Sequence, residues 1–228
     1  GQVVGFGARV VDSDDQPKFM NSPQTAFFDK GSLLYGLDKS YMRIREERAA
    51  VLVEGYMDVI AAHQDGFTNV VSAMGTALTE KQLRLLKRYA PRVVLALDPD
   101  VAGDRATLRS LTVARQNLER ESAPIFDPRG LLRDEGHLEL DIRVATMPNE
   151  MDPDELIASD PESWRSLISK APSIVDYVMD VFTTGRDLQD SKVKAEIIDD
   201  IVPIISDVSH PAERADYMQK LARALRVD

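Results

Sequence analysis

The chain has 228 residues, of which 43% are hydrophobic and 29% are charged, and this allows one good core or a core with a small satellite domain. It contains no cysteine, which excludes disulfides and cysteine-ligated zinc or iron–sulfur sites within these residues. The net charge of −10 argues by itself against nucleic-acid binding, but the acidic excess is concentrated in residues 151–200, while residues 1–100 are close to neutral.

The three histidines are far apart in the sequence, so a metal ion here would be held by oxygen ligands, which suits Mg²⁺ or Mn²⁺. No apolar run approaches the roughly 20 residues that a membrane span needs. Residues 1–11 lack the pattern of a signal peptide. The chain begins without methionine, in what reads as the middle of a strand, and we expect it to be an excised piece of a longer protein.

The first part of the chain, residues 1–48, predicts a small mixed α+β segment. Residues 3–11 alternate and are rich in valine, which favours a strand, and residues 18–20 are its expected partner after a turn. Residues 40–48 suit a short helix.

A regular alternation of strands and helices starts at Ala49 and predicts a parallel α/β sheet. Apolar runs predict buried strands, and periodic segments predict the helices between them. Thr79 and Gln82 form a capping box that starts a helix. The expected strands are residues 49–55, 68–74, 92–98 and 140–146, and the expected helices are residues 56–66, 79–89 and 104–120.

Residues 121–138 have no periodicity and read as an exposed insertion. A short helix is expected after Asp152, and beyond Pro161 the pattern is helical throughout. The expected helices of this bundle are residues 161–170, 173–183, 190–207 and 211–226. We therefore divide the chain into residues 1–48, an α/β domain of residues 49–160 with flanking helices on a mostly parallel sheet, and a helical subdomain of residues 161–228.

Acidic side chains occur where three of the expected strands give way to turns. They are Glu54, Asp98 with Asp100, and Asp152 with Asp154, and Asp58 follows Glu54 by one helical turn. The carboxyl ends of parallel strands share one edge of a sheet, where ligands bind. These carboxylates are therefore expected to converge from segments that are far apart in sequence.

A cluster of carboxylates requires neutralisation, because two like charges 4 Å apart repel by roughly 4 kcal/mol at an effective dielectric of about 20. Proton uptake is one solution, and bound divalent cations are the other. Two such ions can stabilise the attacking and leaving oxygens of a phosphoryl displacement. Taken singly, each acid also has an ordinary explanation as a helix cap or turn residue.

At this point the residues resemble the Toprim segment of bacterial DnaG-type primases. The motifs that carry the resemblance are Glu54-Gly55-Tyr56-Met57-Asp58-Val59, Gly75-Thr76-Ala77-Leu78-Thr79, Asp98-x-Asp100-x-Ala102-Gly103 and Asp152-Pro153-Asp154-Glu155. Further motifs are similar to the primase segment just before the Toprim fold, namely Val4-Gly5-Phe6-Gly7-Ala8-Arg9, Pro17-Lys18-Phe19-Met20-Asn21-Ser22-Pro23 and Lys30-Gly31-x-x-Leu34-Tyr35-Gly36-Leu37.

The resemblance implies a nucleotidyltransferase that makes short RNA primers on single-stranded DNA from ribonucleoside triphosphates, using two or more Mg²⁺ or Mn²⁺ ions. It implies that the metal ligands are Glu54, Asp98, Asp100, Asp152 and Asp154, with Glu54, Asp98 and Asp100 as the catalytic set and Asp58 as an outer member. It also implies a groove for template, nucleotide and nascent RNA, formed by Lys18, Asn21, Lys30 and Arg9. Without the resemblance, Lys18 and Lys30 would read as solvated surface lysines, and Tyr56 as a packing residue.

The complete proteins of this family also have an upstream zinc-binding domain, a further polymerase subdomain, and a distal domain that binds the replicative helicase. None of these is recognisable in the sequence, so we expect the helicase contact to lie in a region absent here, and the isolated piece to be inactive if it depends on those parts. The family implies a bacterial cytoplasmic protein of the replication machinery, with no membrane contact.

The sequence departs from the family pattern at a few positions. Pro99 replaces the usual glycine between Asp98 and Asp100, and it restricts Asp98 to extended conformations. Glu150 adds negative charge beside Asp152. The alternatives are another Toprim enzyme, a topoisomerase or nuclease, a non-catalytic module held together by a structural ion, and a phosphoacceptor receiver domain.

Overall fold

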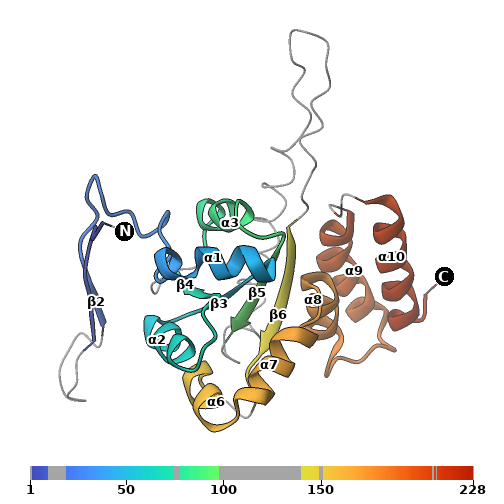
Figure 1. Ribbon diagram of the computed structural model, residues 1–228. Coiled ribbons are helices and arrows are strands. Elements are labelled where there is room, and N and C mark those ends of the chain that lie inside the picture. The colour runs from blue at the N-terminus through green and yellow to red at the C-terminus, as the bar shows by residue number, and fades with distance from the viewer. Residues whose placement is uncertain are drawn as a thin grey trace.

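The computed structural model describes residues 2–9, 19–73, 78–97, 140–148, 151–206, 208 and 210–227 (Figure 1). The expected helix 104–120 and the insertion 121–138 lie outside the described residues, as do Lys18, Asp98 and Asp100. In the described part of the chain, no helix is long and apolar enough to cross a membrane.

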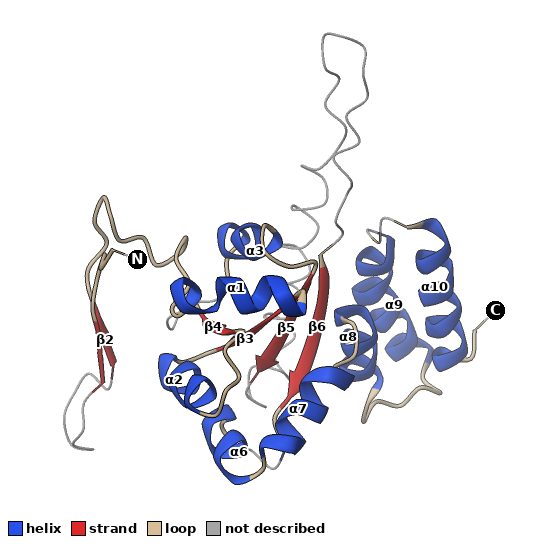
Figure 2. Ribbon diagram, viewed as in Figure 1, coloured by secondary structure: helices blue, strands red, loops and turns tan. Residues whose placement is uncertain are grey.

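A four-stranded parallel sheet forms the centre of the molecule, in the order β4-β3-β5-β6 (Figure 2). Its strands are β3 (Ala49–Val53), β4 (Val70–Ser72), β5 (Arg92–Leu97) and β6 (Asp141–Thr146). The four strands occur where the sequence predicts them. β4 is shorter than the expected 68–74, and it pairs with β3 through residues 70–72.

Helices cover both faces of the sheet, which explains why its strands are apolar on both sides. Ala50 and Leu52 of β3 pack with the buried residues of α1 (Leu37–Glu47) and α3 (Glu80–Lys87). The alternate residues, Val51 and Val53, belong to a second cluster with the other set of helices. These helices are α2 (Tyr56–Gln64), α6 (Pro153–Ser159) and α7 (Pro161–Lys170).

The C-terminal helices continue the first of these two clusters rather than forming a separate core. Ile174 and Phe182 of α8 are fully buried in the same cluster as Val144 of β6. Figure 1 shows α8 beside β6, with the two last helices packed beyond it. The helices are α8 (Ile174–Thr183), α9 (Ser191–Ser206) and α10 (Pro211–Leu225). Each matches its predicted range to within one residue at either end.

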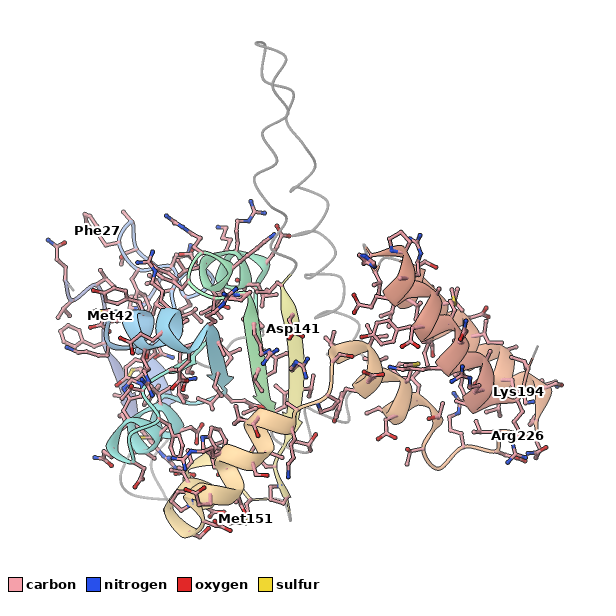
Figure 3. All side chains as sticks on the ribbon, turned by 45° about the vertical axis from the view of Figure 1, so that its right-hand side comes forward. Phe27, Met42, Asp141, Met151, Lys194 and Arg226 are labelled. Atoms are coloured by element: carbon pink, nitrogen blue, oxygen red, sulfur yellow. The ribbon has the colours of Figure 1, made fainter. Side chains whose placement is uncertain are left out.

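The first N-terminal strand begins later than the sequence predicts, at Gly7 instead of residue 3. β1 (Gly7–Arg9) pairs antiparallel with β2 (Phe19–Asn21), whereas residues 2–6 form no strand in place of the expected 3–11. This ribbon has no buried face, because all three residues of β1 are exposed. Nearby, the side chain of Phe27 is 81% exposed (Figure 3). A two-stranded ribbon of this kind has little packing to extend it.

Helix α1 begins three residues before its predicted start at residue 40, and Gly36 explains the difference. Gly36 has a φ of 83°, which side-chain-bearing residues rarely adopt, and a Cβ there would lie 2.9 Å from Val59. The glycine therefore allows the helix to start against α2. In the sequence, this stretch reads as part of a compact loop.

Candidate active site

The first predicted metal ligand, Glu54, follows directly after the last residue of β3 and is half-buried. Its main-chain carbonyl accepts a hydrogen bond of 2.7 Å from the hydroxyl of Ser72, at the end of the neighbouring strand β4. The backbone of Ser72 is itself paired with Tyr35. These bonds fix the backbone that carries Glu54 at the carboxyl edge of the sheet.

Asp58 has a structural role at this edge. Its carboxylate accepts a hydrogen bond of 3.0 Å from the N–H of Gly55 and so closes the turn between β3 and α2. An acid in the first helical turn is also stabilised by the helix dipole. Asp58 thus holds the turn that presents Glu54.

The second described pair of acids lies at the start of α6, after the end of β6. The Oδ1 atom of Asp154 accepts a hydrogen bond of 2.9 Å from the N–H of Glu155, while Asp152 is exposed at the N-cap. Helix α6 packs against α2, the helix that follows Glu54 (Figure 1). Both helices start after parallel strands, so both acidic segments follow the same edge of the sheet.

The strand register supports the predicted convergence but does not complete it. Leu52 pairs with Leu95 in the parallel register, so Glu54, two residues further on, is level with Leu97, and Leu97 in turn pairs with Thr146 of β6. Asp98 and Asp100 come next in the sequence but lie outside the described residues. Within the described ranges, no group of three or more histidine or carboxylate side chains is placed to hold a metal ion.

The N-terminal segment lies across this edge, where side-chain hydrogen bonds hold it. The hydroxyl of Tyr56 donates to the carbonyl of Ala8 at 2.8 Å, and the hydroxyl of Thr79 donates to the carbonyl of Gly31 at 2.5 Å. Tyr56 begins α2, and Thr79 caps α3. The segment is therefore attached to the starts of two helices at the carboxyl edge.

A buried glutamine fixes the loop that carries Lys30. The side-chain amide of Gln82 is fully buried and donates to the carbonyls of Lys30 and Leu33, at 2.9 and 2.8 Å. Its side-chain oxygen accepts from the N–H of Thr79 at 3.0 Å, completing the predicted capping box. The backbone of Lys30 is thereby held beside the start of α3, and its side chain is half-exposed.

The carboxylate of Asp29 organises the same loop. It accepts a hydrogen bond from the N–H of Gly31 at 3.0 Å and lies 3.6 Å from the ammonium of Lys81. The hydrogen bond from Gly31, with smaller contributions from Ser32 and Lys81, lowers the pKa of Asp29 below its usual value. Asp29 therefore remains ionised at neutral pH.

Two more residues of the predicted groove lie on the N-terminal ribbon. Asn21 of β2 pairs with Gly7 of β1, and Arg9 is exposed at the end of β1. A Cβ at Gly7 would lie 3.0 Å from Asn21 Oδ1 and 3.5 Å from the ring of Tyr56. Glycine at this position thus permits the ribbon to approach α2.

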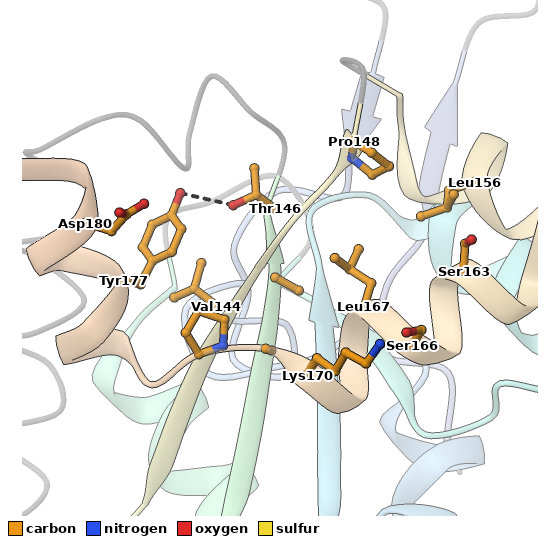
Figure 4. Close-up of a pocket in the computed structure, with 13 residues that line it drawn as sticks. Val144, Thr146, Pro148, Leu156, Ser163, Ser166, Leu167, Lys170, Tyr177 and Asp180 are labelled. Atoms are coloured by element: carbon orange, nitrogen blue, oxygen red, sulfur yellow. Dashed lines mark hydrogen bonds between the residues drawn. The ribbon is translucent and has the colours of Figure 1, made fainter. Parts of the chain in front are cut away.

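A pocket of about 520 Å³ lies at the outer side of β6, between α7 and α8 (Figure 4). Thr146 and Tyr177 meet in its wall through a hydrogen bond of 3.1 Å, and Lys170 lies at another side. The described residues that line it include none of the predicted metal ligands. The carboxyl edge, rather than this pocket, is therefore the candidate active site.

Three family models match the chain. They describe a Toprim-like domain over residues 51–127, the N-terminal domain of the DNA primase catalytic core over residues 1–41, and a DnaB-helicase binding domain of primase over residues 175–228. The last match corrects one expectation, because a segment resembling the helicase-binding domain lies within the chain rather than outside it.

Curated relatives and solved structures agree with these models. A DNA primase of Clostridium acetobutylicum is 39% identical over 223 residues, which cover 97% of this chain and 33% of that protein. The E. coli primase catalytic core is 28% identical with a TM-score of 0.77, covering 100% of this chain and 67% of that chain. A DnaG primase catalytic domain bound to ssDNA is 28% identical with a TM-score of 0.75, covering 98% and 66%.

The chain spans about a third of the length of the curated relatives that it matches. The solved catalytic cores cover its N-terminal ribbon, its sheet and its helical tail together. Because the motifs, the parallel sheet with its flanking helices and these similarities coincide, the chain belongs to the bacterial DnaG-type primase family and corresponds to the Toprim-containing part of its catalytic core.

Proposed function

We propose that this chain is the catalytic segment of a DNA primase, which joins ribonucleotides into short RNA primers on a single-stranded DNA template during replication. The observation that carries the proposal is the N-terminal segment held across the carboxyl edge beside Glu54, through the Tyr56–Ala8 and Thr79–Gly31 hydrogen bonds. The similarity to a primase catalytic domain bound to ssDNA supports the same conclusion.

The residues that would hold divalent metal ions are Glu54, Asp98, Asp100, Asp152 and Asp154. The described members fit such ions, because they supply only carboxylate oxygens, and the backbone of Glu54 is fixed by Ser72. One oxygen of Asp154 is engaged by the N–H of Glu155, and among the described residues its other oxygen accepts no hydrogen bond. Two Mg²⁺ or Mn²⁺ ions, when bound, would neutralise the triphosphate and favour the ionised form of the attacking 3′-hydroxyl.

The chain's own contribution to the transfer is positioning. The 3′-oxygen forms a bond to the α-phosphorus as the bond from that phosphorus to pyrophosphate breaks, and the hydroxyl proton leaves to solvent. The phosphates of template, nucleotide and nascent RNA would be contacted by Lys18, Asn21, Lys30 and Arg9. Gln82 holds the backbone of Lys30, and Asn21 and Arg9 lie on the ribbon. Asp58 would support Glu54 through the turn that it caps.

The wider assignments follow the same proposal. Residues 1–48 would be the end of the polymerase subdomain, residues 49–160 the Toprim domain, and residues 161–228 a helical subdomain. The match over residues 175–228 supports the replicative helicase as a partner through that tail. The bacterial relatives support a place in the cytoplasmic replication machinery.

The match of residues 1–41 to the primase N-terminal domain favours a primase over the other Toprim enzymes. The Glu54→Gln substitution distinguishes a module held together by a structural ion from a catalytic site. If the ion is structural, the substitution should lower folding stability. If the site is catalytic, it should remove nucleotidyl transfer and leave the fold intact.

The test has two parts. The first is thermal melting of the wild-type chain and its variants with and without millimolar Mn²⁺. The second is primer synthesis by the full-length primase carrying the same substitutions. A ligand that binds only the folded state stabilises it by about 2.7 kcal/mol at a hundred times its Kd. Mn²⁺ should raise the melting temperature of the wild type and raise that of Glu54→Gln and Asp98→Asn much less. Both variants should lose primer synthesis.

The matched control is Glu162→Gln, which removes an exposed carboxylate of α7 that pairs with Arg165. It should behave as the wild type in both assays. The proposal would be contradicted if Mn²⁺ left the melting temperature of the wild-type chain unchanged and the wild-type full-length protein made no primers. The carboxylates would then not form a catalytic metal site.

A further inference from the structure

An aromatic and basic surface lies on the side of the sheet covered by α1 and α3. The ring of Tyr41, which is 40% exposed, meets the ring of Tyr89 edge-on, with centroids 6.3 Å apart. The guanidinium of Arg45 lies over Tyr89, at 5.6 Å from the ring centroid. We name this set of three residues the tyrosine–arginine patch. Figure 3 labels Met42, which follows Tyr41 on α1.

The patch is electropositive although the chain as a whole is acidic. Arg48 and Arg88 are exposed and flank the patch in sequence, at the ends of α1 and α3. In the described part of the chain, no carboxylate lies within ion-pair distance of Arg45, Arg48 or Arg88.

The three acids of α1 are paired with other side chains, and Asp38 lies 3.8 Å from the ammonium of Lys39. Glu46 and Glu47 both pair with Arg43, at 3.2 and 2.8 Å. Tyr41 and Arg45 are one helical turn apart and share a face of α1, whereas Arg43 lies on another face. Glu46 and Glu47 are therefore turned away from the patch, while Asp38, three residues before Tyr41, lies on its side of α1 and is paired with Lys39.

We infer that the tyrosine–arginine patch binds single-stranded nucleic acid at a distance from the carboxylate edge. Exposed aromatic rings stack on bases irrespective of sequence, and neighbouring arginines contact phosphates. The inference rests on the proposed function, because it gives the template a second contact on the same molecule.

The position of the patch predicts a dependence on strand length. Helix α1 leads into the first residue of β3, and α3 leads towards the first residue of β5, so their ends lie at the amino edge of the sheet. Glu54 follows the opposite end of β3, about 16 Å away for a five-residue strand. At about 3.4 Å per stacked nucleotide, an oligonucleotide must exceed about five nucleotides to contact both edges.

The experiment measures the affinity of the chain for fluorescent oligothymidylates of about 4 and about 16 nucleotides, at several salt concentrations. Tyr41→Ala should weaken binding of the long oligonucleotide about tenfold and that of the short one less, because the short one can also bind at the carboxylate edge alone. Arg45→Gln should lower the slope of log affinity against log salt by about 0.7, the contribution of one phosphate contact to a single strand. Melting temperatures confirm that each variant is folded at the assay temperature.

Arg165→Gln is the matched control, because Arg165 also lies over an aromatic ring, that of Phe67 at 5.5 Å, but is paired with Glu162. Equal affinities of the wild type and both patch variants for the long oligonucleotide would overturn this inference and leave the proposed function, tested at Glu54, untouched. A salt-sensitive self-association lost in Arg45→Gln, with unchanged DNA affinity, would overturn it in favour of an acidic protein surface. Loss of affinity in all three variants would show a general effect of charge or stability rather than a site.

Discussion

The hydroxyl of Tyr56 donates a hydrogen bond to the carbonyl of Ala8, 48 positions earlier in the chain, and this bond joins the N-terminal ribbon to the helix that follows Glu54. The ring of Tyr56 also contacts that of Tyr35, with centroids 5.7 Å apart. Because β1 is exposed along its length, this hydrogen bond is one of the contacts that hold the ribbon against α2.

We expect Tyr56→Phe to loosen the ribbon while leaving the sheet intact. The bond is exposed, and a hydrogen bond of this kind contributes about 1 kcal/mol net, so the melting temperature should change little. Amide hydrogen exchange at Gly7, Ala8 and Arg9 should become faster. In the full-length protein, the substitution should reduce template affinity and primer yield.

Tyr35→Phe is the control for this experiment, since it removes the same atom from the ring that packs against Tyr56. Among the described residues, the hydroxyl of Tyr35 makes no hydrogen bond. Equal exchange rates in the two variants would contradict an anchoring role for the Tyr56 hydroxyl.

A second prediction concerns Gln82. Gln82→Leu keeps the approximate size of the side chain but leaves the carbonyls of Lys30 and Leu33 and the N–H of Thr79 without their present partner. Burying such groups unsatisfied is costly, and we expect a loss of about 3 kcal/mol in the free energy of unfolding, measured by urea denaturation. Gln219→Leu, on the exposed face of α10, should change it by less than about 0.5 kcal/mol. Similar values for the two variants would mean that the loop is held by other contacts.

The regular part of the fold is predictable from the sequence because its signals are local. The apolar runs, the capping box at Thr79 and the prolines at the first positions of α6, α7 and α10 place most element boundaries within two or three residues. The strand order is a different matter. It depends on which strands meet in three dimensions, and the sequence predicts only that the sheet is parallel.

The site is less predictable, because its supporting bonds connect residues distant in sequence. Ser72, Gln82 and Tyr56 each donate a side-chain hydrogen bond to the backbone of another segment. The pattern of apolar and polar residues along the sequence does not predict such contacts. Ser72 does leave one signal, since it is a polar residue in an otherwise apolar strand. The convergence of Asp98 and Asp100 with Glu54 stays a prediction.

A third prediction follows from the lowered pKa of Asp29. A carboxylate whose pKa is lower in the folded chain than in the unfolded chain, where it is about 3.9, contributes stability that is present above that value. This contribution disappears as the pH falls through the folded-state pKa. The side-chain resonance of Asp29 in an NMR titration should therefore have a midpoint below about 3.9, and the Gly31 amide should shift with the same midpoint. In Asp29→Asn, the Gly31 shift should be independent of pH over this range. A midpoint at or above the unfolded value would contradict the role of the Gly31 hydrogen bond.

The last prediction tests how Glu54 is positioned. Ser72→Ala removes the buried hydroxyl that binds the Glu54 carbonyl at 2.7 Å, while the backbone pairing of Ser72 with Tyr35 does not need the side chain. We expect a loss of about 1–3 kcal/mol in stability, because the carbonyl loses its partner at a mostly buried position. If the bond also orients the metal site, the stabilisation by Mn²⁺ should be smaller in Ser72→Ala than in the wild type, when each is measured from its own metal-free melting temperature. Ser169→Ala removes a comparable hydroxyl-to-carbonyl bond of 2.9 Å on α7, and its Mn²⁺ response should equal that of the wild type. An undiminished Mn²⁺ response in Ser72→Ala would mean that this bond stabilises the strand ends without setting the geometry of Glu54.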